Sequence, residues 1–213
     1  MKRRELAVRL RAPSHPPPVD NVEYHAHPAV SKSHLDEIER SPLHYWSRFL
    51  DPDRATPPPT PAMVIGTALH THVLEMHQWD KQFIVAPAGI DRRTKAGKEE
   101  WAAFESLANK RTVISREDGE TIAAMGRAIY GHPAAAMLLT MAGRAETSHF
   151  WTDETTGIEC KCRPDWLLED CTVIVDLKTT EDASPSGFQR SIAKFNYHKQ
   201  AAWYLHGVEQ STG

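Results

Sequence analysis

The nine-residue run TVIVDLKTT, Thr172–Thr180, constrains the fold more than any other stretch of the chain. Val, Ile and Thr favour a pleated, half-buried strand, yet this run ends with Asp176 and Lys178, and charged side chains are rarely buried unless they are paired. Because side chains alternate along a strand, Asp176 and Lys178 project to the same side. The run therefore predicts a strand that carries an acid and a base to one shared site.

The region from Ala145 to Lys178 has the pattern of three β-strands. Its β-rich runs are separated by turn signals at Thr155–Gly157 and at Glu169–Asp170, which predicts a three-stranded antiparallel meander. In the middle strand apolar residues alternate with charged ones, so one face should be apolar and the other charged. Cys160 and Cys162 fall on the apolar face and are interpreted as buried small hydrophobes.

The predicted turn also fixes a register. A tight turn at Glu169–Asp170 would place Asp165 opposite Ile174 and diagonal to Asp176. Diagonal neighbours in an antiparallel pair are roughly 7 to 8 Å apart, so two carboxylates there can converge on one cation. A divalent metal would keep both carboxylates ionised and offset the cost of burying their charge.

Proline clusters punctuate the N-terminal part of the chain, and helices follow. The Pro-rich stretches Ser14–Pro28 and Asp51–Pro61 are expected to be extended or irregular. Between them, Ser33 and Asp36 have the spacing of a capping box, which predicts a short helix. Longer helices are predicted at Ala62–His77, Trp101–Asn109, Gly119–Tyr130, Ala134–Met141 and Phe188–His206.

Composition limits the class of protein. The chain has 213 residues, of which 40% are hydrophobic and 25% charged, enough for one globular domain. It has neither an apolar signal-peptide core nor a run of the roughly 20 apolar residues that a membrane span needs, and three cysteines fit a reducing compartment. We therefore expect a cytoplasmic protein. A net charge of −3 neither suggests nor excludes DNA as a partner.

Five short motifs occur along the chain in the order found in a known family, and two longer segments narrow the resemblance. RPD at Arg163–Asp165, followed by VDLKTT, resembles the PD-(D/E)xK nuclease signature. GTALH (Gly66–His70), AETSHFW (Ala145–Trp151) and QAAWY (Gln200–Tyr204) are similar to the GxxxH motif, the strand before the core hairpin and the QxxxY helix of the RecB-like branch. SKSHLDEIERSPLHYW and TGIECKCRPDWL narrow the resemblance to the exonuclease VIII (RecE-type) nuclease domain of phages and prophages, over about Ser31 to Gly207.

The resemblance implies a fold and a metal site. The fold would be a restriction-endonuclease-like α/β (α+β) core, in which a central mixed sheet with an antiparallel meander is flanked by helices. Mg²⁺ or Mn²⁺ would be the cofactor, since these ions favour oxygen ligands. Asp165, Asp176 and Lys178 would be the catalytic residues. The implied metal ligands are His70, Asp165, Asp176 and the backbone carbonyl of Leu177, and Glu146 could bind a second metal or join the acidic cluster.

The resemblance also implies contacts with DNA. Gln200 and Tyr204, four residues apart and so on one helix face, would meet the DNA backbone, with Lys199 and Arg163 beside them. Arg92 and Arg93 belong to a basic cluster that could track phosphates, although a solvated charged loop is an equally open interpretation.

The implied activity is metal-dependent exonuclease digestion of linear double-stranded DNA from its ends, yielding single strands for recombination. A single-strand annealing protein would be the functional partner, and a homo-oligomer would be the assembly. Two alternatives stay open: a structure-specific or single-strand nuclease of the same superfamily in repair or defence, and a non-catalytic DNA-binding module. Residues 1–30 are expected to be a flexible, Pro-rich arm and residues 31–213 the nuclease domain, which the comparison with the RecE type suggests is truncated at its C-terminus.

Overall fold

A computed structural model describes residues 15–213 of the chain. These residues form two compact units. The first unit takes the residues up to Ala55 together with Ala142–Asp176 and Thr180–Gly213, and the second consists of Thr56–Met141 and Leu177–Thr179. The basic segment MKRRELAVRLR, at the start of the expected arm, lies outside the described residues.

The second unit is built around helix α4, Pro61–Leu74. Thr60 caps this helix through its side chain, and Pro61 occupies the first helical position, where its missing N–H costs nothing. Ala68 and Leu69 are buried in the core of the unit. The sequence predicted this helix, because sixteen residues without a proline follow the second Pro cluster.

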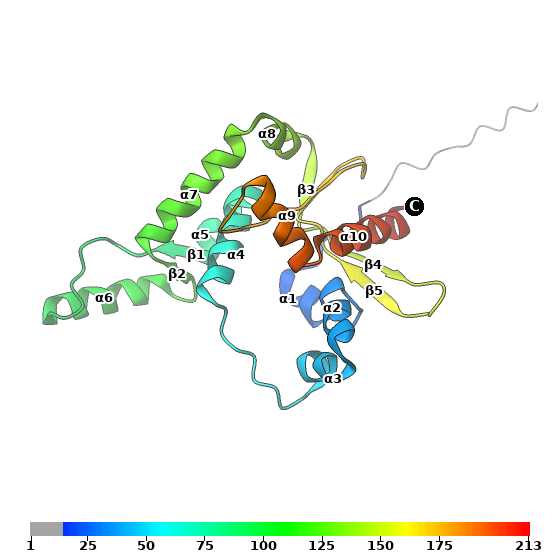
Figure 1. The fold of residues 1–213 in the computed structure, drawn as a ribbon. Helices are drawn as coiled ribbons and strands as arrows, with labels where there is room; N and C mark the ends of the chain where they lie inside the picture. Colours follow the sequence, from blue (N-terminus) through cyan, green and yellow to red (C-terminus); the bar gives the residue numbers. More distant parts are fainter. Residues whose placement is uncertain (1–14) are drawn as a thin grey trace, which may run out of the picture. The chain divides into compact units, whose positions relative to one another are not determined.

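Helices and two short strands make up the rest of the second unit (Figure 1). Phe83, Ile114 and Ile122 pack with α4, and the side chain of Leu177 packs against the same cluster. Two short strands in this unit pair in parallel and were not predicted, because three residues are too few to show a period. The elements are η2 (Met76–Gln78), α5 (Trp79–Gln82), β1 (Phe83–Val85), α6 (Lys95–Ala108), β2 (Thr112–Ile114), α7 (Arg116–Gly131) and α8 (Pro133–Thr140).

The first unit has two small antiparallel sheets and a set of helices. The sheets have the strand orders β4-β5 and β3-β6-β7. The strands are β3 (Gly143–Ala145), β4 (His149–Thr152), β5 (Glu159–Cys162), β6 (Trp166–Leu168) and β7 (Ile174–Val175). The helices are α1 (Asn21–Ala26), α2 (Lys32–Arg40), α3 (Pro42–Tyr45), η1 (Trp46–Leu50), α9 (Pro185–Lys194) and α10 (Tyr197–Thr212).

The expected three-stranded meander is divided between these two sheets. Strand β5 pairs with β4, whereas the residues that follow it form β6 and pair with β3 and β7. Pro164, which cannot donate to a strand ladder, separates β5 from β6. The structure thus has mixed α and β elements with small sheets. The expectation of one central meander is corrected to two separate small sheets in this region.

The register of the second hairpin also differs from the predicted one. Trp166 pairs with Val175, and the amide of Leu168 donates to the carbonyl of Val173, so the turn spans four residues. Cys171 in this turn has φ +57°, the left-handed region. Pairing is therefore shifted by two residues from the expected register, which changes the partner of each residue but keeps its face.

The β4-β5 hairpin and α10 enclose the core of the first unit. Trp151, Cys160 and Cys162 are buried there, and Trp203 from α10 packs against them with its ring 5.0 Å from that of Trp151. The indole N–H of Trp203 donates to the carbonyl of Lys161 at 2.9 Å. The interpretation of the two cysteines as buried small hydrophobes agrees with this packing.

Lys161 departs from the predicted alternation, because it is buried at 2% exposure. Its ammonium donates to the carbonyls of Tyr24 and His27, at 2.7 and 2.6 Å. The backbone of Val30 extends β5 by a parallel bridge at Cys160. Residues 21–30 are thereby attached to the hairpin, and α1 lies within Ser14–Pro28, which was expected to be extended or irregular.

Helix boundaries account for the remaining differences. The predicted helix Phe188–His206 is two helices, α9 and α10, separated at Asn196, whose φ of +54° cannot continue a helix. Helix α2 is capped by Ser31, not Ser33. Helix α1 begins after Asp20, whose side chain accepts from the amide of Glu23.

A stability test follows from Gly207, where α10 approaches the hairpin. A Cβ added there would lie 2.5 Å from Cζ3 of Trp151 and 2.7 Å from Sγ of Cys162. We expect Gly207→Ala to lower the free energy of unfolding by about 1 to 3 kcal/mol, because the core must shift to admit the methyl group. Urea titration followed by tryptophan fluorescence measures this loss.

The matched control is Gly131→Ala, the last residue of α7, where an added Cβ meets no heavy atom within 4 Å. This variant should be unchanged, or more stable by up to about 1 kcal/mol. Equal stabilities for the two variants would contradict the described packing of α10.

Within residues 15–213, none of the helices combines the length and the apolar character that a bilayer span requires.

Candidate metal centre

Three acids occupy one end of the β3-β6-β7 sheet. Glu146 directly follows β3, Asp165 directly precedes β6, and Asp176 directly follows β7. Because β6 runs antiparallel to both of its neighbours, these three positions meet at the same end of the sheet. They continue the paired row formed by Ala145, Trp166 and Val175. We call these three acids the carboxylate row.

Contacts within the row support this arrangement. The amide of Glu146 donates to the carbonyl of Asp165 at 3.0 Å, and a carboxylate oxygen of each lies within 4.8 Å of the other. Asp165 is 8% exposed, and Glu146 has φ +51°, which is uncommon for a residue other than glycine. Two carboxylates at such close range repel each other, so a neighbouring positive charge stabilises them.

Arg163 supplies one such charge. Its Nε donates to Oε2 of Glu146 at 3.0 Å, and one of its terminal nitrogens donates to the hydroxyl of Ser148 at 3.1 Å. The guanidinium also lies over the ring of Tyr24, 5.3 Å from its centre. The structure places Arg163 against an acid of the row, and its predicted contact with DNA stays a prediction.

Helix α10 brings an amide and a phenol to the row. The amide of Gln200 donates to a carboxylate oxygen of Asp176 at 3.0 Å. Burial, and then the charges of Asp176 and Asp165, raise the pKa of the Tyr204 hydroxyl well above its ordinary value. That hydroxyl is therefore protonated at neutral pH and can donate a hydrogen bond. The break before α10 leaves Gln200 and Tyr204 on one helix face, one turn apart.

The second unit places two other predicted ligands together. His70 projects from α4, and its Nε2 lies 2.9 Å from the carbonyl oxygen of Leu177, to which it donates. Leu177 is the residue that follows Asp176 in the chain. Lys178 comes next and is half-buried.

The remaining predicted DNA contacts lie in surface pairs. Lys199 bonds both carboxylate oxygens of Glu39 at 2.6 Å. The guanidinium of Arg92 lies 4.3 Å from the ring centre of Trp101, and Arg93 pairs with Asp91. Such exposed pairs are weak and can exchange partners, so a role in DNA binding stays a prediction for all three.

Neither the burial of Lys161 nor the stacked rings of His34 and Phe49 were predicted from the sequence. These residues come from segments more than a hundred positions apart, and nothing local links them. Helix α1, by contrast, had a detectable signal, since Asp20 and Glu23 have the spacing of an N-terminal cap.

The residues of the carboxylate row fit a hard divalent cation. Carboxylate oxygens are the donors that Mg²⁺ and Mn²⁺ prefer, and two of them already lie within 4.8 Å of each other. An acid as buried as Asp165 is also ionised at lower cost when a cation shares its site. The identity of the ion is not fixed by these donors.

Mixed α and β elements with an Asp and a following Asp-x-Lys are typical of the PD-(D/E)xK class of domain, whose members are generally metal-dependent nucleases. The family described as PDDEXK-like domain of unknown function (DUF3799) matches residues 31–213. The chain belongs to this family. No curated protein matches the chain.

Proposed function

We propose that the protein is a metal-dependent exodeoxyribonuclease, which hydrolyses phosphodiester bonds from the ends of linear double-stranded DNA. The observation that carries this proposal is the carboxylate row with Gln200 bonded to Asp176. A protein that only binds DNA has no use for three acids at one sheet end, because they repel phosphate. Membership of a PDDEXK-like family supports the hydrolytic reaction class.

The proposed metal ligands are Asp165 and Asp176 with the carbonyl of Leu177 and the imidazole of His70, and Glu146 stands beside them. When bound, Mg²⁺ or Mn²⁺ would acidify a water and neutralise charge on the scissile phosphate. His70 can ligate through Nε2 only in the tautomer that carries its proton on Nδ1, so metal binding would replace the hydrogen bond between Nε2 and the carbonyl of Leu177.

The other residues have proposed roles that need no metal. The ammonium of Lys178 would orient the attacking water and stabilise the negative charge that develops on the phosphate oxygens. The protonated hydroxyl of Tyr204 and the amide of Gln200 would donate to the DNA backbone. Lys199, Arg92 and Arg93 would contact phosphates farther along the strand.

We further propose that the enzyme is RecE-like and acts in the cytoplasm as a homo-oligomer. Its single-stranded product would be handed to a single-strand annealing protein for recombination. The sequence resemblance to the RecE type supports these proposals.

Digestion of matched DNA substrates tests the proposal. Purified protein with Mg²⁺ should release nucleotides from end-labelled linear duplex and leave the same DNA intact when it is a covalently closed circle. Removal of the metal with EDTA should stop the reaction, and Mn²⁺ should restore it. Equal digestion of linear and circular DNA would contradict the exonuclease and favour the structure-specific or single-strand nuclease.

A further inference from the structure

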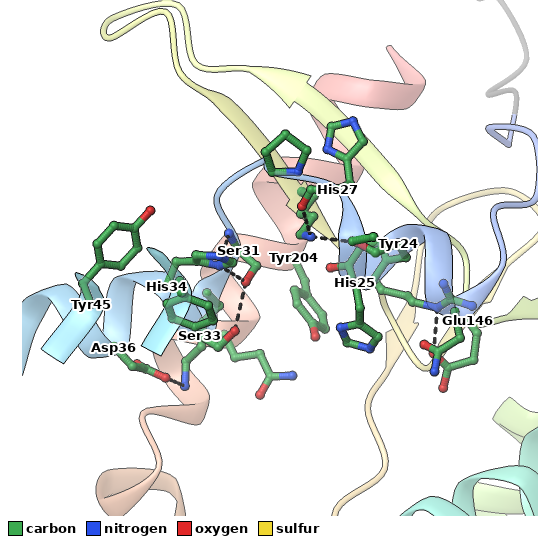
Figure 2. A pocket seen from close by; sticks show the side chains of 18 of the residues that line it. Tyr24, His25, His27, Ser31, Ser33, His34, Asp36, Tyr45, Glu146 and Tyr204 are labelled. Atoms are coloured by element: carbon green, nitrogen blue, oxygen red, sulfur yellow. Dashed lines mark hydrogen bonds and ion pairs between the residues drawn. The ribbon is translucent and has the colours of Figure 1, made fainter. Parts of the chain in front are cut away.

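The largest cavity described in the first unit opens beside the carboxylate row (Figure 2). Its volume of about 640 Å³ is in the range typical of small-molecule and cofactor sites, roughly 300 to 1,000 Å³. Glu146, Gln200 and Tyr204 line one part of it, so the cavity adjoins the proposed reaction site. Most of the rest comes from α1, α2, η1 and the residues beside them, with Tyr45, Lys161 and Arg163. We call it the α1-α2 pocket.

One wall of the α1-α2 pocket is aromatic. The ring of His34 stacks on that of Phe49 at 3.8 Å and 21°, and Tyr45 packs against both at 5.9 and 5.6 Å. Figure 2 shows Tyr204 of α10 pointing into the space between the α1 and α2 segments. Aromatic surfaces at the edge of a water-accessible cavity are suited to stacking a flat, polar ring.

The charges of the lining favour an anion. Each of its two carboxylates pairs with a cation, Glu146 with Arg163 and Asp36 with Lys32. Lys161 is a third cation, and its ammonium donates to backbone carbonyls. Among the described residues that line the pocket, cations thus outnumber carboxylates by three to two.

Burial favours the neutral form of two histidines of the pocket, His25 and His34. Burial, and then the charges of Lys161 and Arg48, lower the pKa of His34 to about 4, and burial with Lys161 also lowers the pKa of His25. Neutral imidazoles offer one donor and one acceptor each, together with a flat face. They are therefore suited to contact a nucleobase and are not additional phosphate-binding cations.

We propose that the α1-α2 pocket binds one unpaired nucleotide of the DNA strand, with its base stacked on the His34–Phe49 ring pair. This inference rests on the proposed function for the identity of the polymer. It adds that the nucleotide enters the pocket unpaired, because a base that stays paired carries the other strand with it and cannot enter a pocket alone. The substrate is thus a DNA end whose terminal nucleotide is released from pairing.

Binding of deoxyadenosine 5′-monophosphate tests the pocket, with deoxyribose 5-phosphate as the probe that lacks a base. Calorimetric titration in EDTA removes any contribution of metal or of cleavage. Stacking predicts that the nucleotide binds about tenfold more tightly than the sugar phosphate. Phe49→Leu should abolish this difference, and Phe49→Tyr should keep it, because only the latter retains an aromatic face.

Phe188→Leu is the matched control, since Phe188 is a partly exposed ring of the same unit that does not line the pocket. It should bind both probes as the unaltered protein does. Circular dichroism shows whether each variant is folded. Equal affinity for the two probes in the unaltered protein, or an unchanged preference in folded Phe49→Leu, would overturn the inference.

The two proposals fail separately. A nuclease that is active yet indifferent to Phe49 would overturn the α1-α2 pocket alone. A protein that binds the nucleotide through Phe49 but cuts no DNA would support the pocket and contradict the proposed exonuclease.

Discussion

Asp176→Asn should lower the rate of nucleotide release from linear duplex by about 10³-fold, since a metal's charge stabilisation of a phosphoryl transition state amounts to several kcal/mol. The substituted amide is nearly the same size but carries no charge, so the fold should be preserved. Gln200, which donates to Asp176 in the structure, can still donate to the amide oxygen. End-labelled duplex and calorimetric Mn²⁺ titration measure activity and metal affinity in parallel.

Loss of both activity and Mn²⁺ affinity in this variant is the expected pair of results. The matched control is Glu154→Gln, an exposed acid in the β4-β5 turn, which should change neither. Unchanged Mn²⁺ affinity in Asp176→Asn would show that Asp176 is not a metal ligand, whatever the activity of the variant.

Lys178→Ala should lower the rate by about 10² to 10³-fold while metal is still bound. An ammonium near a cation site repels the metal, so Mn²⁺ affinity should stay the same or rise when that ammonium is removed. Mn²⁺ affinity should fall in Asp176→Asn but not in Lys178→Ala. This difference distinguishes a metal ligand from a group that acts on water and phosphate. The same assays measure both quantities.

Lys110→Ala is the control for this substitution, because Lys110 is exposed in the turn after α6. It should retain full activity. Weaker Mn²⁺ binding in Lys178→Ala would mean that Lys178 supports the structure of the site, and full activity would exclude it from the reaction.

Much of the local structure could be predicted from the sequence, since it depends on neighbouring residues. The helix that begins after Thr60 and the one capped by Ser115 follow from a proline-free apolar run and a capping residue. Strand alternation also correctly predicted buried Cys160 and Cys162. These features need no knowledge of distant contacts.

Pairing between strands was predicted less well, because it depends on the turn. The sequence favoured a two-residue turn at Glu169–Asp170, and the structure has a longer one in which Cys171 adopts a left-handed conformation. A shift by two residues preserves the faces of a strand, so Asp165 and Asp176 still meet at one sheet end. The predicted register of this hairpin was therefore wrong, and the predicted faces of its side chains were unaffected by the shift.

Long-range contacts outside the motifs that carry the family resemblance could not be predicted. Lys161 appeared to be a solvated residue of the charged face, yet its ammonium holds the carbonyls of Tyr24 and His27. These partners are 137 and 134 positions apart in the chain, and no local sequence pattern connects residues at such a separation. The α1-α2 pocket depends on such contacts and is therefore visible only in the structure.

The most direct test of the metal centre is a crystal structure determined with Mn²⁺, using the anomalous signal of the ion. The proposed metal site predicts a peak roughly 2.0 to 2.3 Å from carboxylate oxygens of both Asp165 and Asp176 and from the imidazole of His70. A peak bound by other residues, or side chains of Asp165 and Asp176 that point to opposite faces of the β3-β6-β7 sheet, would contradict it.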